Sequence, residues 1–200
     1  MSNTELIREL RALTQAGMKD CKEALEEAGW DLQKAVDLIK VKGLNIVSGR
    51  EGKVAADGLV TIYNLTTPPT PVNIMLEVNC QTDFVANSDD FKKFVASTLE
   101  TIGECHRNQN VFDVSLVEPA RQQLVASTKE NVVVRRWWIE ESLDASRVLV
   151  FPYLHSNSKI GVLVTLQAPS LEASESQAFR ELGFDLAMQI AAMNPITVSD

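Results

Sequence analysis

The sequence predicts an α+β protein, in which a helical bundle precedes a core of antiparallel sheet with helices packed on one face. Three observations support this fold class. Apolar residues recur every three or four positions over residues 4–43, as on the buried faces of short helices. Small and polar residues dominate the stretch that follows, which is typical of a linker. After residue 58, strand-like runs come in neighbouring groups with helical segments between the groups. We therefore expect a three-helix bundle over residues 1–44, a linker over residues 45–57 and an α+β core over residues 58–200.

The bundle consists of three predicted helices. The second covers residues 19–28 and ends at Gly29, and the third starts after the capping residue Asp31 and ends at Gly43. A Met-Gly-like turn at Met18 precedes the second helix, so the module resembles the ubiquitin-associated type of bundle. The first helix has an apolar stripe at helical spacing, made of Leu6, Ile7, Leu10 and Leu13.

The core is predicted to contain both strands and helices. Its first two strands flank residues 66–71, a stiff turn with three prolines, since proline cannot donate to a strand ladder. The last helix ends before Asn194 and Pro195. The predicted strands cover residues 59–65, 72–78, 131–139, 148–155 and 160–167, and the predicted helices cover residues 88–105, 116–127 and 174–193.

Composition limits the class of protein. A net charge of −8 argues against a nucleic-acid binder, because neutralising phosphates needs a basic surface. The nearest basic candidate, Arg135-Arg136, precedes two tryptophans, but neighbouring side chains in a strand face opposite ways and do not form one stacking surface. No window approaches 18 consecutive apolar residues, so no membrane span is expected. The N-terminus lacks a signal-peptide pattern and the three cysteines are far apart, so we expect a cytoplasmic location.

No residue pattern indicates catalysis. The two histidines, His106 and His155, lack further ligands at metal-binding spacing. A Gly-x-Ser-x-Gly nucleophile elbow is absent from the sequence. Residues 49–53 contain glycines and a lysine, but not in the spacing of a phosphate-binding loop. We therefore expect a protein that is not an enzyme and that has no catalytic residues, metal ligands or cofactors.

The most informative segment lies between the second strand and the helix that starts at Ser88. Residues 82–87 are predicted to be a connection between them. Phe84 and Val85 lie in this connection beside Asp83. An aromatic side chain outside regular structure and next to a charge suits insertion into a partner protein.

Two structural alternatives for this segment stay open. Phe84 can instead pack as a staple against Phe91 or another core residue. Asp83 can instead be an N-cap, because a carboxylate accepts hydrogen bonds from the first turn of a helix. Exposure of the two side chains decides between these alternatives and a partner-binding role.

Five blocks of the sequence, in the expected order, resemble the elongation factor Ts family. The family's core signature is matched by residues 76–85, Leu-Glu-Val-Asn-Cys-Gln-Thr-Asp-Phe-Val. Its N-terminal signature is matched by Thr-Gln-Ala-Gly-Met-Lys-Asp-Cys-Lys-Glu-Ala-Leu at residues 14–25. The other matches are residues 54–60, 130–136 and 159–164, so the resemblance covers nearly the whole chain.

The resemblance implies a guanine-nucleotide exchange factor for elongation factor Tu, a translational GTPase. In the family, the segment that matches Thr82, Asp83, Phe84 and Val85 intrudes beside the switch region of the GTPase and displaces its magnesium ion. Arg50 and His155 match further partner-contact positions, and the N-terminal bundle docks on the GTPase. The alternative is a protein-binding adaptor without exchange activity that uses the ubiquitin-associated-like module.

The chain also departs from the family pattern. Many members carry a duplicated core and are longer, so this chain resembles the short form, in which two chains can pair as a homodimer. Residues 127–129, Ser-Thr-Lys, stand where the family often has an apolar residue and a glycine. This difference affects one peripheral contact with the partner.

Overall fold

The computed structural model describes residues 2–14, 16–65, 71–142 and 146–197. The chain forms two compact units, and neither unit is continuous in sequence. The first contains Met1–Asp57, Cys80–Phe94 and Asp113–Val133, and the second contains Gly58–Asn79, Val95–Phe112 and Val134–Asp200. The predicted proline turn lies largely at residues 66–70, outside the described residues.

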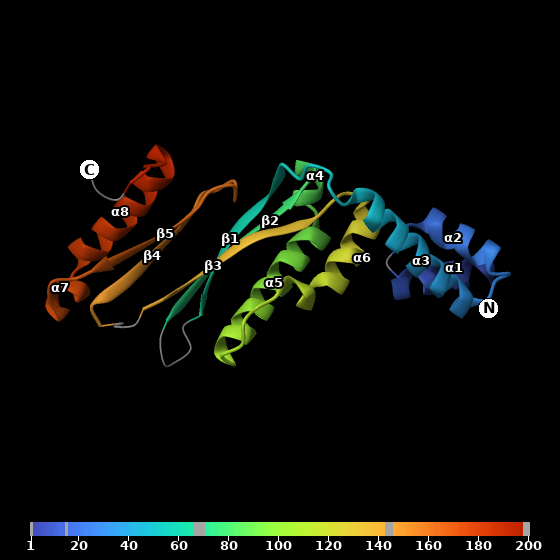
Figure 1. Ribbon diagram of the computed structural model, residues 1–200, viewed down its shortest axis with the longest axis horizontal. Helices are drawn as coiled ribbons and strands as arrows, with labels where there is room; N and C mark the ends of the chain where they lie inside the picture. The colour runs from blue at the N-terminus through green and yellow to red at the C-terminus, as the bar shows by residue number, and fades with distance from the viewer. Residues whose placement is uncertain (1, 15, 66–70, 143–145, 198–200) are drawn as a thin grey trace. The chain divides into compact units, whose positions relative to one another are not determined.

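Helices α1 (Asn3–Thr14), α2 (Met18–Glu27) and α3 (Leu32–Arg50) form the N-terminal bundle, coloured blue to cyan in Figure 1. As predicted, Asp31 caps α3, and its carboxylate accepts a hydrogen bond of 3.0 Å from the Lys34 amide. The predicted three-helix bundle is therefore confirmed. Its fully buried core consists of Leu10, Cys21, Ala24, Leu25 and Ala35.

The end predicted for the third helix at Gly43 is wrong, because α3 continues to Arg50. A glycine inside a helix costs about 1 kcal/mol but does not stop it, and no proline follows nearby. A Cβ atom at Gly43 would lie 3.4 Å from the Cβ of Ala126, so the glycine allows close packing at this point. The helix ends before Gly52, which has a φ of +79°. Residues 45–50 of the predicted linker are thus helical, and the division into bundle, linker and core stays a prediction.

The first unit also contains short helices that follow the bundle in sequence. These are α4 (Asp83–Ala86), the 3-10 helix η1 (Val114–Leu116) and α6 (Glu118–Thr128). Helix α6 ends at Lys129, which has a left-handed conformation with a φ of 61°. Glycine is the usual residue at such a position, because it has no Cβ to clash with the backbone.

The α+β class is confirmed, and the strands form two sheets where the sequence predicted one. Strands β1 (Asp57–Leu65), β2 (Val72–Cys80) and β3 (Val133–Glu141) form a sheet in the order β1-β2-β3. Strands β4 (Val148–Leu154) and β5 (Gly161–Gln167) form an antiparallel hairpin.

The β4–β5 hairpin meets β1 through its loop instead of through a strand ladder. The Val60 amide donates to the Ser158 carbonyl at 2.7 Å, and the Lys159 ammonium donates to the Gly58 carbonyl at 2.7 Å. Both bonds lie at the tip of the hairpin, and the hairpin forms a sheet separate from β1-β2-β3. This long-range arrangement has no signature in the local sequence.

Helix α5 (Asp89–Arg107) carries the apolar stripe that its sequence predicts. Its residue Gly103 lies against the first sheet, where an added Cβ would be 3.1 Å from Leu65 and 3.6 Å from Ile74. Strand β2 buries alternate side chains completely, as expected for a strand with one face in the core. The buried side chains are Ile74, Leu76, Val78 and Cys80 in β2, and Phe91, Phe94, Val95, Leu99 and Ile102 in α5.

The last predicted helix is two helices, α7 (Leu171–Glu175) and α8 (Gln177–Met193). Ser176 separates them, because its hydroxyl accepts a hydrogen bond of 3.3 Å from the Phe179 amide and caps α8. Figure 1 shows α8 lying along the β4–β5 hairpin. Phe151 of the hairpin makes edge contacts with Phe179 and with Phe184, at ring-centre distances of 6.1 and 5.4 Å.

In the part of the chain that the structure describes, every helix is too short or too polar to cross a membrane.

Two helical glycines are expected to respond oppositely to substitution by alanine. A Cβ at Gly183 of α8 would lie 2.5 Å from ring atoms of the buried Phe151, so Gly183→Ala should destabilise the fold by about 1–3 kcal/mol. Gly49 of α3 has open space around it, so Gly49→Ala should stabilise by up to about 1 kcal/mol. Urea unfolding of both variants measures the difference. A neutral or stabilising Gly183→Ala would contradict the described packing of α8.

The Glu118–Arg121 pair should make stability depend on pH. Arg121 donates two hydrogen bonds of 2.7 Å to the Glu118 carboxylate, and these hold the pKa of Glu118 below its ordinary value of 4.5. A carboxyl whose pKa is lowered by folding stabilises the folded state above that ordinary value and loses this contribution as pH falls through the lowered pKa. Glu118→Gln should therefore destabilise most near neutral pH, and its deficit should shrink below about pH 4.5. Thermal unfolding between about pH 7 and about pH 3 measures this, with Glu104→Gln as the charge-matched control. A deficit that is constant over this range would contradict the assignment.

Candidate partner-binding site

Residues 82–85 form the start of helix α4, although the sequence predicted a connection without regular structure. Thr82 is the N-cap, and its hydroxyl accepts a hydrogen bond of 3.3 Å from the Val85 amide. A Thr followed by an acid is a favourable helix start, because the acid lies at the positive end of the helix dipole. The N-cap alternative for Asp83 is therefore wrong, since Asp83 lies inside the first turn.

The turn presents Phe84 to solvent and buries Val85. Phe84 is 83% exposed, whereas the next residue, Val85, is 5% exposed. Consecutive residues on a helix point about 100° apart, so one turn can anchor itself with one side chain and present the other. Phe91 is fully buried, and the exposed Phe84 is not a staple against it. Asp83 is exposed beside Phe84, and within the described ranges its carboxylate makes no hydrogen bond or ion pair.

Ser88 joins this short turn to the long helix α5. Its hydroxyl donates to the Val85 carbonyl at 2.7 Å and accepts from the Phe91 amide at 3.3 Å. The helix start predicted at Ser88 is thereby confirmed. The Asn87 side chain donates to the Asp83 carbonyl at 2.8 Å, which satisfies a carbonyl in the last turn of α4.

Glu130, which follows α6, anchors the other end of the turn. One carboxylate oxygen accepts hydrogen bonds from the amides of Gln81 and Thr82, at 3.1 and 3.0 Å. The other oxygen accepts a hydrogen bond of 2.7 Å from the Thr82 hydroxyl. Sequence reasoning assigned Glu130 no role, because 48 residues separate it from Thr82 and no local pattern marks the pairing.

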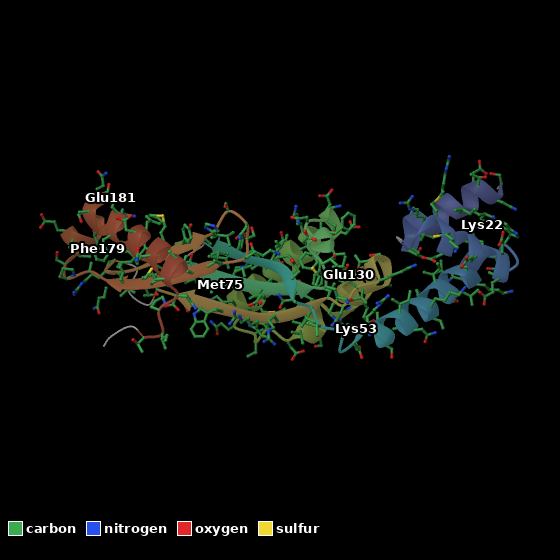
Figure 2. All side chains as sticks on the ribbon, turned by 90° about the horizontal axis from the view of Figure 1, so that it is seen from above. Lys22, Lys53, Met75, Glu130, Phe179 and Glu181 are labelled. Atoms are coloured by element: carbon green, nitrogen blue, oxygen red, sulfur yellow. The ribbon has the colours of Figure 1, made fainter. Side chains whose placement is uncertain are left out.

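A second set of hydrogen bonds supports the same junction. The Asn131 amide donates to the Gln81 side chain at 2.9 Å, and the Asn131 side chain donates to the Lys53 carbonyl at 2.8 Å. Asn131 is 6% exposed, so the two bonds hold a buried polar side chain. Figure 2 labels Glu130 and Lys53, which belong to the two chain segments that meet at this junction.

The remaining predicted contact residues lie elsewhere in the fold. Arg50 is the last residue of α3 and is half-buried, in the same compact unit as α4. His155 belongs to the other unit and is exposed in the β4–β5 loop, where its Nδ1 lies 2.9 Å from the Tyr153 hydroxyl. The structure thus brings Thr82, Asp83, Phe84 and Val85 together in one turn.

A metal site needs several ligand side chains close together. Among the residues that the structure describes, no group of three or more His, Cys, Asp or Glu side chains lies at metal-binding distance. The arrangement around α4 instead presents an exposed carboxylate and an exposed aromatic ring on one capped turn.

Truncating Phe84 should leave the fold intact. Phe84→Ala is expected to change the free energy of unfolding by no more than about 0.5 kcal/mol, because the exposed ring contributes little to the core. Phe91→Ala, seven residues along the chain, is expected to cost about 3–5 kcal/mol because it removes a fully buried ring. Urea unfolding monitored by circular dichroism measures both. A cost above 2 kcal/mol for Phe84→Ala, as estimated for a buried side chain, would show that the ring packs in the core.

Comparison with known protein families matches both parts of the chain. The profile of the family described as "Elongation factor TS" matches residues 81–200, which include α4, Glu130 and the β4–β5 hairpin. The profile described as "UBA-like domain" matches residues 4–39 in the N-terminal bundle. The second match agrees with the three helices and the buried core described above.

Curated relatives match along almost the entire chain. The elongation factor Ts of Clostridium kluyveri is 37% identical over 208 residues, which covers 100% of this chain and 65% of the relative. That of Nostoc sp. is 36% identical and covers 95% of this chain and 62% of the relative. That of Helicobacter acinonychis is 37% identical and covers 96% of this chain and 54% of the relative. The chain spans less than two thirds of the length of these relatives, and it belongs to the elongation factor Ts family.

Proposed function

We propose that this chain is a guanine-nucleotide exchange factor that promotes GDP release from elongation factor Tu. Membership of the elongation factor Ts family supports this role. The observation that carries it is the exposure of Phe84 on an anchored helical turn. A ring that is 83% exposed gains little for the fold and is accessible to a partner, and it lies in the segment that matches the family signature.

The proposed action is a wedge beside the magnesium ion of the GTPase. Mg²⁺ requires near-ideal octahedral geometry and links protein groups to the phosphates of the nucleotide. Insertion of Phe84 next to the switch region shifts the backbone that helps to hold the ion, and Asp83 enters beside it. Displacing the ion removes a large share of the contacts that retain GDP.

The exchange factor and GDP must weaken each other's binding to the GTPase. If the factor weakens GDP binding, then GDP must weaken the binding of the factor to the same extent. Each tenfold effect corresponds to about 1.4 kcal/mol of differential binding. Burying one phenylalanine side chain contributes about 1.5–3 kcal/mol, so Phe84 alone accounts for roughly one to two powers of ten. A wider interface must provide the rest.

The local structure suits this task because the wedge is formed before the partner arrives. Ordering a flexible segment on binding consumes part of the interaction energy, and a preformed turn avoids that loss. Val85 is buried and Thr82 is committed to the helix cap, so these two residues support the turn. Thr82, Asp83 and Phe84 are exposed, but the Thr82 hydroxyl is occupied by Glu130 and by the helix cap, so Asp83 and Phe84 are the two proposed to contact the partner.

Other contacts complete the proposal. Arg50 and His155 are proposed as further contacts with the GTPase, and the N-terminal bundle as a docking module for it. Pairing of two copies as a homodimer stays a prediction of the family resemblance. So does a cytoplasmic site of action, without direct contact with nucleic acid.

The test is release of fluorescently labelled GDP from elongation factor Tu in excess Mg²⁺. The parent chain should accelerate release, and Phe84→Ala should reduce this acceleration by about tenfold or more, as the loss of a buried ring predicts. Asp83→Asn, which keeps the shape and removes the charge, should also reduce it. Val111→Ala, at a position that is 91% exposed, is the matched surface control and should behave as the parent.

The outcomes separate the candidate functions. Binding to the GTPase without acceleration of GDP release favours the adaptor function and contradicts exchange. Acceleration that survives both Phe84→Ala and Asp83→Asn contradicts the wedge and leaves exchange in place.

A further inference from the structure

We propose that Glu130 is a positioning residue for nucleotide exchange, acting through the α4 turn that presents Phe84. This inference rests on the proposed function. Glu130 itself need not touch the partner. Its carboxylate fixes the entrance of α4 and thereby the direction in which Phe84 projects.

Two consecutive hydrogen bonds connect Glu130 to the first turn of α4. The Thr82 hydroxyl has one proton, and it donates that proton to Glu130 at 2.7 Å. A lone pair of the same oxygen then faces the Val85 amide, which donates to it at 3.3 Å. Glu130 therefore orients the group that caps α4. Without the carboxylate, the Thr82 hydroxyl is free to rotate and the cap weakens.

Glu130 also fixes the backbone that leads into the turn. The amides of Gln81 and Thr82 both donate to one of its oxygens, at 3.1 and 3.0 Å. Hydrogen bonds to a charged acceptor are stronger than those between neutral groups. The backbone conformation just before α4 is thus defined by a residue from a distant part of the sequence.

The segment that carries Glu130 is itself held in place. The chain leaves α6 through the left-handed residue Lys129, whose amide donates to the Val125 carbonyl at 2.8 Å. On the other side, Asn131 bonds back to the Gln81 side chain at 2.9 Å. Gln81 and the pair Glu130-Asn131 therefore bond reciprocally. The Asn131 side chain also donates to the Lys53 carbonyl at 2.8 Å, so the segment that carries Glu130 is held by a group outside α4 and its entrance.

A short helix needs such an anchor. Helix α4 has 4 residues, and isolated helices of this length are unstable in water. Phe84 is 83% exposed and gains little orientation from packing of its own ring. The buried Val85 fixes one side of the turn, and Glu130 fixes its start.

A double-mutant cycle in the full chain tests this role. In the chain with Phe84 intact, Glu130→Ala should lower the acceleration of GDP release from elongation factor Tu by about tenfold. This size corresponds to the loss of a charged hydrogen-bond acceptor. In the Phe84→Ala background, the same change should have less than about a twofold further effect, since residues that act as one unit are not additive. Glu130→Gln, which keeps one carbonyl oxygen, should give an intermediate loss. Glu104→Gln, at an exposed position of α5, is the control and should leave the rate unchanged.

A second readout in the free chain separates this inference from the proposed function. Hydrogen exchange of the Gln81 and Thr82 amides should become about tenfold faster in Glu130→Ala, while the amides of α8 keep the parent rate. Unchanged exchange at Gln81 and Thr82 overturns the positioning role, even when the parent accelerates GDP release. The positioning role is also overturned if Glu130→Ala lowers the acceleration equally in the chain with Phe84 intact and in the Phe84→Ala variant. A parent that fails to accelerate GDP release overturns the proposed function, whatever the amides do.

Discussion

The close approach of helix α5 to the first sheet is the constraint on which the rest of the structure depends. Gly103 contributes to it, since an added Cβ would lie only 3.1 Å from Leu65, which is a tighter contact than usual. The approach encloses the buried face of β2, whose alternate side chains are fully inaccessible to water. Strand β2 leads directly into Gln81 and Thr82 in the sequence.

The site adds a second kind of constraint to this apolar packing. Polar groups around the start of α4 are paired with each other, with two amides donating to one oxygen of Glu130 and a hydroxyl donating to the other. Apolar burial is nondirectional and places a segment only approximately, whereas hydrogen bonds specify angles. Apolar burial and hydrogen bonding together explain how α4, which buries few side chains, presents the Phe84 ring in a defined direction.

Most of the regular structure could be predicted, because it depends on local signals. The cap at Asp31, the helix start at Ser88 and the apolar stripe of α5 all follow from side chains a few residues apart. The predictions failed where contacts between segments that are distant in sequence determine the structure. Gly43 does not end α3, and its lack of a side chain instead allows close packing on Ala126. The pairing of Glu130 with Thr82 and the separation of the strands into two sheets likewise have no local pattern. The sequence predicted the four residues of the turn as a partner contact, which stays a prediction, and it did not predict the hydrogen bonds from Glu130 that support the turn.

The exposure of Phe84 has a genetic consequence. A position that contributes almost nothing to folding is free from selection for stability, so under the proposed wedge role only selection for binding would preserve Phe84. Replacing Phe84 should leave a chain that folds and accumulates normally, unlike most damaging substitutions, which act by lowering abundance. Such a chain would retain every other surface through which it meets its partners. A mutant allele at this codon would therefore give a normal amount of a protein with reduced activity. Where mutant and intact chains are both present, the mutant chain would compete with the intact chain for their partners.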